Sequence, residues 1–308
     1  MDELSQLDWL KEAQQIFSSQ LASDSVAHAQ LLGLEAGYGA ELLLNHFASL
    51  ALCDKPSRGR PCGFCRACHL VEANNHPDLH IVKPDGQQIK VDQIRHLCHS
   101  LVTTAQQGGR RVAIIYHSEK MNIAAANALL KTLEEPGDDT LLLLQTDTPS
   151  LLMPTISSRC QKINVHIPSK QQINVWLQAN SQIKSDMSWC MPIVGGPLEL
   201  IQALNSGYYQ LLLGYRKAWS DSIQQGHLHS QLLEISEQEI VDVLNVYYLV
   251  LRQLVLQSKF ADALHQAQII NLANEVMETR QRLSMMNNVN PAALCQQLML
   301  KYRHIANG

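Results

Sequence analysis

The chain has little charge and no long run of apolar residues, and each lack excludes a class of protein. Charged residues make up 17% of its 308 positions, and the formal net charge is −4. A dedicated nucleic-acid-binding protein usually has a basic surface, so this balance argues against that class and leaves room for a local basic patch only. No apolar run approaches about 18 residues, the length of a membrane-spanning helix, so we expect no membrane span.

The N-terminal segment also lacks the features of a secretion signal. Its first four residues, Met1 to Leu4, are acidic, and neither a basic start nor an apolar core follows. We therefore expect a cytoplasmic protein, and 308 residues are enough for two or three domains. In that compartment the eight cysteines are better explained as metal ligands or free thiols than as disulfides.

Four of the cysteines have the spacing of a zinc site. The pattern is C-x8-C-x2-C-x2-C, and its members are Cys53, Cys62, Cys65 and Cys68. Four thiolates complete a tetrahedral zinc site with no open position, so the predicted metal is structural and not catalytic. The alternatives are four unrelated thiols, which the spacing disfavours, and a redox C-x2-C pair, which the shared Cys65 disfavours. The remaining cysteines are expected to be small buried apolar residues.

A glycine-containing turn lies between a predicted strand, His28–Leu34, and a predicted helix, Leu42–Leu52. Strand, glycine turn and helix form the context of a phosphate-binding P-loop, G-x-x-x-x-G-K-[ST]. The turn contains Gly37 and Gly39, but Ala40 stands where the lysine belongs and Glu41 where the hydroxyl residue belongs. Glu41 would repel phosphate. The residues alone leave two interpretations open: a decayed nucleotide site, or an ordinary connection that never bound anything.

The stretch from Asn127 to Cys160 is the most informative part of the chain. Strong helix formers fill Ala124–Glu135, and Pro136 ends that helix. The apolar run Leu141–Leu144 is typical of a strand covered on both faces. Ser158, Arg159 and Cys160 follow, just before another short apolar segment. We expect this arginine at the edge of a parallel sheet where α/β proteins keep their chemistry.

The second half of the chain has a different pattern. From Gly207 onward the apolar residues follow a 3.6-residue period almost throughout, and strand signals are absent. This pattern predicts a helical bundle of about 100 residues.

The block Asn-Ala-Leu-Leu-Lys-Thr-Leu-Glu-Glu-Pro, residues 127–136, together with Ser158-Arg159-Cys160, resembles the bacterial DNA polymerase III clamp-loader family of AAA+ proteins. The resemblance runs from about Ala29 to Ile167, with a weaker echo near Pro291. It implies an α/β class AAA+ domain over residues 1–167 that carries the zinc knuckle (53–68), a small helical lid over 168–206 and a helical collar over 207–308.

The resemblance also implies that three nucleotide contacts are missing, the first of them the P-loop lysine that Ala40 replaces. Tyr116 and His117 stand where the family has an Asp-Glu pair for magnesium and its water, and neither replaces a carboxylate on a hard cation. Leu198 occupies the place of the sensor-2 arginine. Thr146, at the sensor-1 place, would then be residual. The family thus favours a decayed nucleotide site, with no ATP bound by this chain.

From the resemblance we expect a nonhydrolysing subunit of a five-subunit ring. Its partners would be ATP-binding gamma or tau subunits and the delta subunit, and through the complex the sliding clamp and primed DNA. Arg159, with Ser158 and Cys160 beside it, would act as an arginine finger on a neighbour's ATP. The expected cofactor is structural zinc.

Three alternatives are weighed against this interpretation. A working ATPase motor of the gamma type is disfavoured by Ala40, Tyr116 and Leu198. A zinc-dependent DNA-binding module is disfavoured by the acidic balance and by an expected lack of interleaved basic and aromatic residues around Cys53–Cys68. For Arg159 itself, the plain alternative is a surface arginine that pairs with a neighbouring carboxylate.

Overall fold

The structure is a computed structural model that describes residues 3–107, 109–181, 186–257, 263–283 and 289–307. The chain divides into two compact units, residues 1–169 and 170–308. The first unit contains the sheet, and in the described part of the second unit all regular elements are helices. The further predicted division between residues 206 and 207 stays a prediction.

The first unit is built on a five-stranded parallel sheet in the order β2-β3-β4-β1-β5. The strands are β1 (Ala29–Gly33), β2 (Leu79–Val82), β3 (Arg111–Ile115), β4 (Thr140–Thr146) and β5 (Gln161–Ile163). Every residue of β3 and β4 is buried, because helices cover both faces of a parallel sheet. The expected α/β fold is confirmed.

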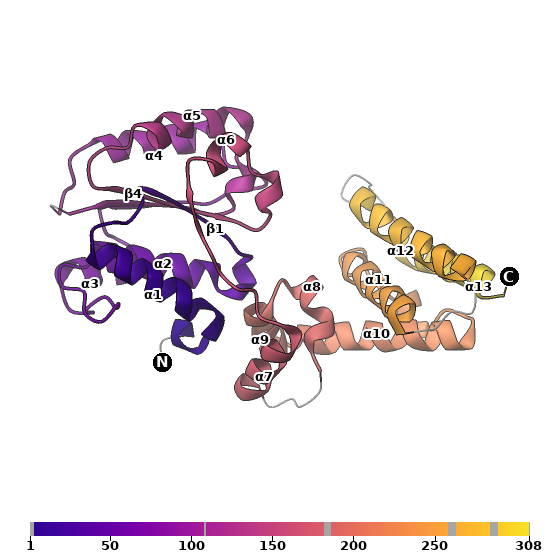
Figure 1. Cartoon of the computed structure of the whole chain (residues 1–308). Coiled ribbons are helices and arrows are strands. Elements are labelled where there is room, and N and C mark those ends of the chain that lie inside the picture. The colour runs from indigo at the N-terminus through magenta and orange to yellow at the C-terminus, as the bar shows by residue number, and fades with distance from the viewer. Residues whose placement is uncertain (1–2, 108, 182–185, 258–262, 284–288, 308) are drawn as a thin grey trace. The chain divides into compact units, whose positions relative to one another are not determined.

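Helices cover the two faces of this sheet in two groups (Figure 1). One face carries α1 (Lys11–Ala22), α2 (Ala40–Leu52) and α3 (Arg66–Glu72); the other carries α4 (Val91–Val102), α5 (Ile123–Glu134) and α6 (Pro154–Ser157). Side chains of α4 and α5 form one core cluster with β3 and β4. Between these elements lie the short 3-10 turns η1 (Glu3–Gln6), η2 (Asp8–Leu10), η3 (Ala36–Tyr38), η4 (Ser118–Lys120) and η5 (Pro149–Leu151).

The second unit is a set of helices packed around aromatic side chains. Trp219 stacks on Tyr247 with ring centroids 3.9 Å apart, and its indole N–H donates to the carbonyl of Val243 over 3.0 Å. The helices are α7 (Lys170–Asn180), α8 (Met191–Val194), α9 (Pro197–Asn205), α10 (Tyr208–Gln225), α11 (Ile240–Gln257), α12 (Ala263–Leu283) and α13 (Pro291–Asn307), with the 3-10 turns η6 (Ser188–Cys190) and η7 (Ser230–Leu233). The predicted helical half is thus confirmed for the described residues.

One helix bears on the expectation about membrane spans. Helix α11 has the length and composition of a membrane-spanning helix, with a mean hydropathy of 1.3 over 18 residues, and it is the single such helix in the described part of the chain. The sequence prediction missed it because Asp242 and Arg252 interrupt the apolar run. One side of α11 is buried in the helical unit, including Leu244, Tyr247 and Leu251, and a buried core helix passes the same test.

The predicted position of Arg159 at the chemically active edge is wrong. In a parallel sheet that edge is formed by the carboxyl ends of the strands. Arg159 precedes β5, so it lies at the opposite, amino edge. His28, which precedes β1, contacts the carbonyl of Leu133 over 3.0 Å, so the end of α5 lies at this edge too. A residue at the carboxyl edge has to follow a strand, whereas Arg159 lies just before β5.

Candidate functional site

The four predicted zinc ligands meet between the end of α2 and the start of α3. The Sγ atoms of Cys62 and Cys68 are 3.9 Å apart, and those of Cys53 and Cys65 are 4.0 Å apart. All four sulfurs lie within 4.8 Å of one another. A tetrahedral zinc with Zn–S bonds of about 2.3 Å holds its sulfurs about 3.8 Å apart, whereas a disulfide brings two sulfurs to about 2.05 Å. The arrangement therefore fits one tetrahedral ion.

Backbone amides already point at these sulfurs. The N–H of Cys62 donates to Sγ of Cys53 over 3.2 Å, and the N–H of Cys68 donates to Sγ of Cys65 over 3.4 Å. Such contacts orient metal-bound thiolates and stabilise their charge. The N–H of Phe64 is the largest influence that lowers the pKa of Cys62, to about 6, while burial raises the pKa of Cys68 to about 12. A bound cation would favour the ionised form of a buried thiol such as Cys68.

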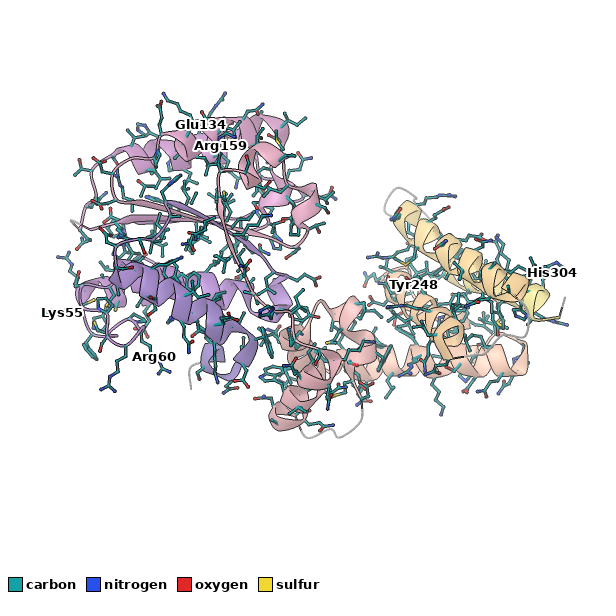
Figure 2. All side chains as sticks on the ribbon, viewed as in Figure 1. Lys55, Arg60, Glu134, Arg159, Tyr248 and His304 are labelled. Carbon is teal, nitrogen blue, oxygen red and sulfur yellow. The ribbon has the colours of Figure 1, made fainter. Side chains whose placement is uncertain are left out.

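The loop around the cysteines presents cations and one aromatic ring to solvent. Its exposed basic residues are Lys55, Arg58, Arg60 and Arg66. Figure 2 labels Lys55 and Arg60, whose side chains extend from this loop. The ring of Phe64 is 80% exposed. The expected lack of interleaved basic and aromatic residues around Cys53–Cys68 is therefore wrong, and a chain with a net charge of −4 has a local basic patch here.

The P-loop-like turn is closed by packing and by an ion pair. Gly37 and Ala40 are buried, and Gly39 takes the left-handed conformation at φ 91° that a glycine permits. The carboxylate of Glu41 lies 2.9 Å from Nζ of Lys83, so its charge is paired. Position 40 is thus fully packed, and the carboxylate at position 41 is paired; the relation of this turn to nucleotide stays a prediction.

The two residues predicted to stand at the magnesium position, Tyr116 and His117, differ in their surroundings. Tyr116 is buried, its hydroxyl donates to Oδ1 of Asn45 over 3.0 Å, and burial raises its pKa. His117 is half-buried and lies beside Glu119 and Asp147 at the carboxyl edge. Tyr116 is thus a core side chain, whereas His117 belongs to a polar cluster.

Two further predicted positions belong to different units of the chain. Thr146 is buried at the end of β4, where its Oγ1 accepts a hydrogen bond from the N–H of Thr148 over 3.2 Å. Leu198 lies in α9 of the second unit. Their correspondence to the two sensor positions stays a prediction.

Arg159 is partly exposed and already paired. Its Nη1 donates to the carbonyl of Thr155 over 2.9 Å, and its Nη2 lies 2.6 Å from Oε1 of Glu134. The two side chains are adjacent in Figure 2. The side chains of Arg159 and Glu134 are 37% and 51% exposed. In this structure Arg159 thus forms the local ion pair that was the alternative to an arginine finger. Sequence reasoning missed the role of Glu134, although it lies inside the informative ten-residue block.

Ser158 and Cys160 have different surroundings on either side of this arginine. The hydroxyl of Ser158 donates to the carbonyl of Thr155 over 3.3 Å at the surface. Cys160 is buried, and burial raises the pKa of its thiol to about 11. Cys160 therefore packs inward while Arg159 stays accessible.

The geometry can now be compared with known proteins. A family model described as "DNA polymerase III, delta subunit" matches residues 9–169, more than half of the chain. The chain belongs to this family. The matched range covers the sheet, the cysteine cluster and Arg159.

Curated relatives carry the name DNA polymerase III subunit delta′. The Pseudomonas aeruginosa protein is 45% identical over 167 residues, which are 53% of this chain and 51% of that protein. The Escherichia coli protein is 26% identical over 297 residues, 90% of this chain and 89% of that protein. In the first of these matches the chain thus spans about half the length of its relative.

A solved structure supports the fold. A gamma subunit-related protein of DNA polymerase III from Thermotoga maritima superposes with a TM-score of 0.53 at 18% identity, covering 96% of this chain and 99% of that one. At that identity the likeness concerns the fold alone. It agrees with the AAA+ type of fold expected from the sequence.

Proposed function

We propose that the chain is the nonhydrolysing delta-prime type subunit of a clamp loader, which helps open sliding clamps and place them on primed DNA. Family membership supports the link to DNA polymerase III. The observation that carries the proposal is the position of Arg159. It lies at the amino edge of the sheet, whereas the P-loop-like turn follows the carboxyl end of β1. An arginine on the opposite edge from its own nucleotide turn is suited to serve a neighbour's nucleotide.

The chemistry of Arg159 fits that task. A guanidinium is always charged, planar and forked, so it can bind two oxygens of a γ-phosphate at once. Arginine fingers stabilise the charge that develops during phosphoryl transfer. In this chain Glu134 and the carbonyl of Thr155 hold the guanidinium at the surface. Binding to a phosphate across an interface would replace or extend these contacts.

The isolated chain should show no magnesium-dependent ATP binding or turnover. Ala40 provides no charge for the β- and γ-phosphates, and Glu41 adds a carboxylate at the turn. Equilibrium dialysis with labelled ATP, run beside a gamma-type subunit as a positive control, measures this. Micromolar affinity with hydrolysis would overturn the assignment and favour the motor alternative.

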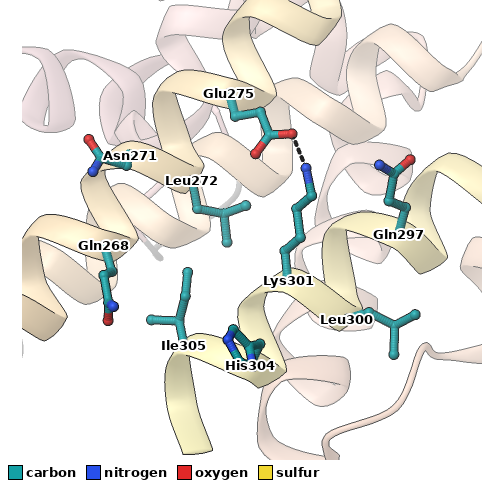
Figure 3. A pocket seen from close by; sticks show the side chains of 9 residues that line it. All are labelled: Gln268, Asn271, Leu272, Glu275, Gln297, Leu300, Lys301, His304 and Ile305. Atoms are coloured by element: carbon teal, nitrogen blue, oxygen red, sulfur yellow. Dashed lines mark hydrogen bonds and ion pairs between the residues drawn. The ribbon is translucent and has the colours of Figure 1, made fainter. Parts of the chain in front are cut away.

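The proposed partners are gamma or tau subunits and delta, with the second unit as the collar that joins them; the place of action is the cytoplasm. A pocket of about 530 Å³ between α12 and α13 supports an assembly role. Figure 3 shows Leu272, Leu300 and Ile305 in this pocket beside the ion pair of Glu275 with Lys301. Leu300 is 57% exposed. Apolar cores with polar rims are typical of subunit interfaces.

Reconstitution with the partner subunits tests the proposed assembly. The chain should co-purify with gamma or tau and delta as one complex on size exclusion. Leu300→Glu should lower the recovered complex at least about tenfold, because it puts a charge into an apolar contact. Ile270→Glu changes a 43% exposed residue of α12 outside the pocket and should have no effect. If Leu300→Glu assembles as well as the wild type, the pocket is not part of the subunit interface. If the wild-type chain does not co-purify with the partner subunits, the proposed function is refuted.

We propose that the four-cysteine knuckle holds structural zinc. When bound, the ion supplies a cross-link between the end of α2 and the start of α3. The residues that would hold it are Cys53, Cys62, Cys65 and Cys68, whose sulfurs have the required spacing. All four positions of a tetrahedron are then filled by protein, which leaves no place for substrate.

A zinc-dependent DNA-binding module is the second candidate, and the basic loop favours it. Arg58, Arg60 and Arg66 suit phosphates, and an exposed ring such as Phe64 can stack on a base. In this alternative the isolated chain binds DNA with an affinity that falls steeply with salt. In the proposed function the chain contacts DNA chiefly through the assembled complex, so the isolated chain binds weakly at physiological salt.

A further inference from the structure

Three polar side chains meet at the carboxyl edge of the sheet, away from the four cysteines. His117 follows β3, Glu119 lies in η4, and Asp147 follows β4. Strands β3 and β4 are parallel neighbours, so their carboxyl ends meet. We call these three residues the His117 cluster. No local pattern predicts this cluster, because Asp147 is 30 positions away from His117 along the chain.

The distances in the His117 cluster are those of ligands around a common ion. Nδ1 of His117 lies 3.0 Å from Oδ2 of Asp147 and 3.7 Å from Oε1 of Glu119. One donor atom from each residue lies within 4.8 Å of the other two. Imidazole and carboxylate ligands bind a divalent transition metal at about 2.0–2.2 Å, which puts neighbouring donors about 3–4 Å apart.

The donors are held in place by a buried amide. Oε1 of Gln145 accepts a hydrogen bond from the N–H of His117 over 2.8 Å, and its Nε2 donates to Oδ1 of Asp147 over 2.7 Å. The same Nε2 donates to the carbonyl of Leu34 over 2.9 Å. This leaves Oδ2 of Asp147 directed at the imidazole. Outer-sphere hydrogen bonds of this kind orient the ligands of metal sites.

An ion pair alone leaves this cluster with unbalanced charge. The side chain of Glu119 is only 7% exposed, and its Oε2 has no hydrogen-bond partner among the described residues. A buried carboxylate without compensation is costly. One imidazole can offset at most one of the two carboxylates.

We propose that His117, Glu119 and Asp147 bind a divalent transition-metal ion, with manganese(II) and zinc(II) as the fitting ions. One imidazole with two carboxylates suits these ions, whereas magnesium and calcium prefer ligand sets made only of oxygen. The ion would neutralise Glu119 and join the loops after β3 and β4. This site is independent of the proposed zinc at the cysteines and of the clamp-loader function, and it requires no nucleotide.

Manganese(II) binding to the full chain tests the proposal. Manganese prefers carboxylate oxygens, whereas thiolates select softer ions, so manganese reports on the His117 cluster and not on the cysteines. Titration followed by the paramagnetic resonance signal of free manganese should give about one bound ion per chain. Asp147→Asn should weaken binding at least about tenfold, since loss of even an outer-sphere partner costs that much. The matched control is Asp85→Asn, an exposed carboxylate in the turn after β2 that pairs with Lys90 and should bind as the wild type does.

A second variant separates a metal site from a structural ion pair. Glu119→Gln removes the buried charge, so without metal its melting temperature should equal or exceed that of the wild type. The increase in melting temperature that manganese causes in the wild type should be lost. A lower melting temperature for Glu119→Gln with unchanged manganese binding would identify an ion pair only. No binding by the wild-type chain at millimolar manganese would also overturn the proposal.

Discussion

Replacing Arg159 with alanine should lower DNA- and clamp-stimulated ATP hydrolysis by reconstituted complexes and slow clamp loading. Arginine fingers contribute roughly 10³–10⁵ in kcat in well-studied systems. A ring with several ATP sites should lose less, because only one site would face this chain. The turnover of that single site should nevertheless fall by about 10³ or more. Steady-state ATPase and loading rates of complexes built with each variant are the measurement.

Three controls make this experiment specific. Arg159→Lys keeps the charge without the fork and should rescue only in part. Arg95→Ala removes another exposed arginine of the first unit, one that pairs with Asp92, and should leave the rates unchanged. As a third control, zinc content and complex assembly should be the same for the wild type, Arg159→Ala, Arg159→Lys and Arg95→Ala. If the Arg159→Ala complex hydrolyses ATP and loads clamps at wild-type rates, Arg159 is not an arginine finger. Its ion pair with Glu134 would then be its only role supported by the structure.

Replacing Cys65 with serine should release the metal of the knuckle. Wild-type chain, purified without chelator, should contain about one zinc per molecule at this site, and the variant close to none. Structural zinc contributes about 10–16 kcal/mol in isolated zinc-binding peptides. Here the ion lies in a loop beside a complete sheet, so loss of zinc should loosen the segment between α2 and α3 and leave the sheet folded.

Elemental analysis and hydrogen exchange measure these two effects. Cys98→Ser is the matched control, because Cys98 is half-buried and donates to the carbonyl of Ala128 over 3.8 Å, outside the knuckle. It should keep the full zinc content. Equal zinc in Cys65→Ser and wild type, or no zinc in either, would end the four-cysteine assignment.

Much of the fold could be predicted because its signals are local. The predicted helix Leu42–Leu52 is confirmed as α2, which begins two residues earlier at Ala40, since apolar residues recur along it at helical spacing. The Leu141–Leu144 run was predicted as a covered strand, and β4 extends it on both sides to Thr140 and Thr146, which are buried as well. Polar residues at strand ends carry no apolar signal, so the prediction was too short.

Of the candidate sites, one could be predicted from local sequence and two could not. The cysteine cluster could be predicted from spacing, because its four members lie within sixteen positions and a hairpin brings such ligands together. The ion pair of Arg159 with Glu134 and the His117 cluster could not, because their members come from separate elements. Which residues meet there depends on strand order, and no local pattern encodes strand order.

The sequence by itself determined the family, the α/β and helical halves, the cysteine spacing and the residues of the P-loop-like turn. It did so because local periodicity, turn chemistry and short motifs are properties of neighbouring residues. Only the tertiary structure decided that Arg159 and the P-loop-like turn lie at opposite edges of the sheet. It also decided that His117 meets Asp147. The physical reason is that parallel strands joined through helices put successive loops at alternate edges, so residues distant along the chain become neighbours while nearby motifs are separated.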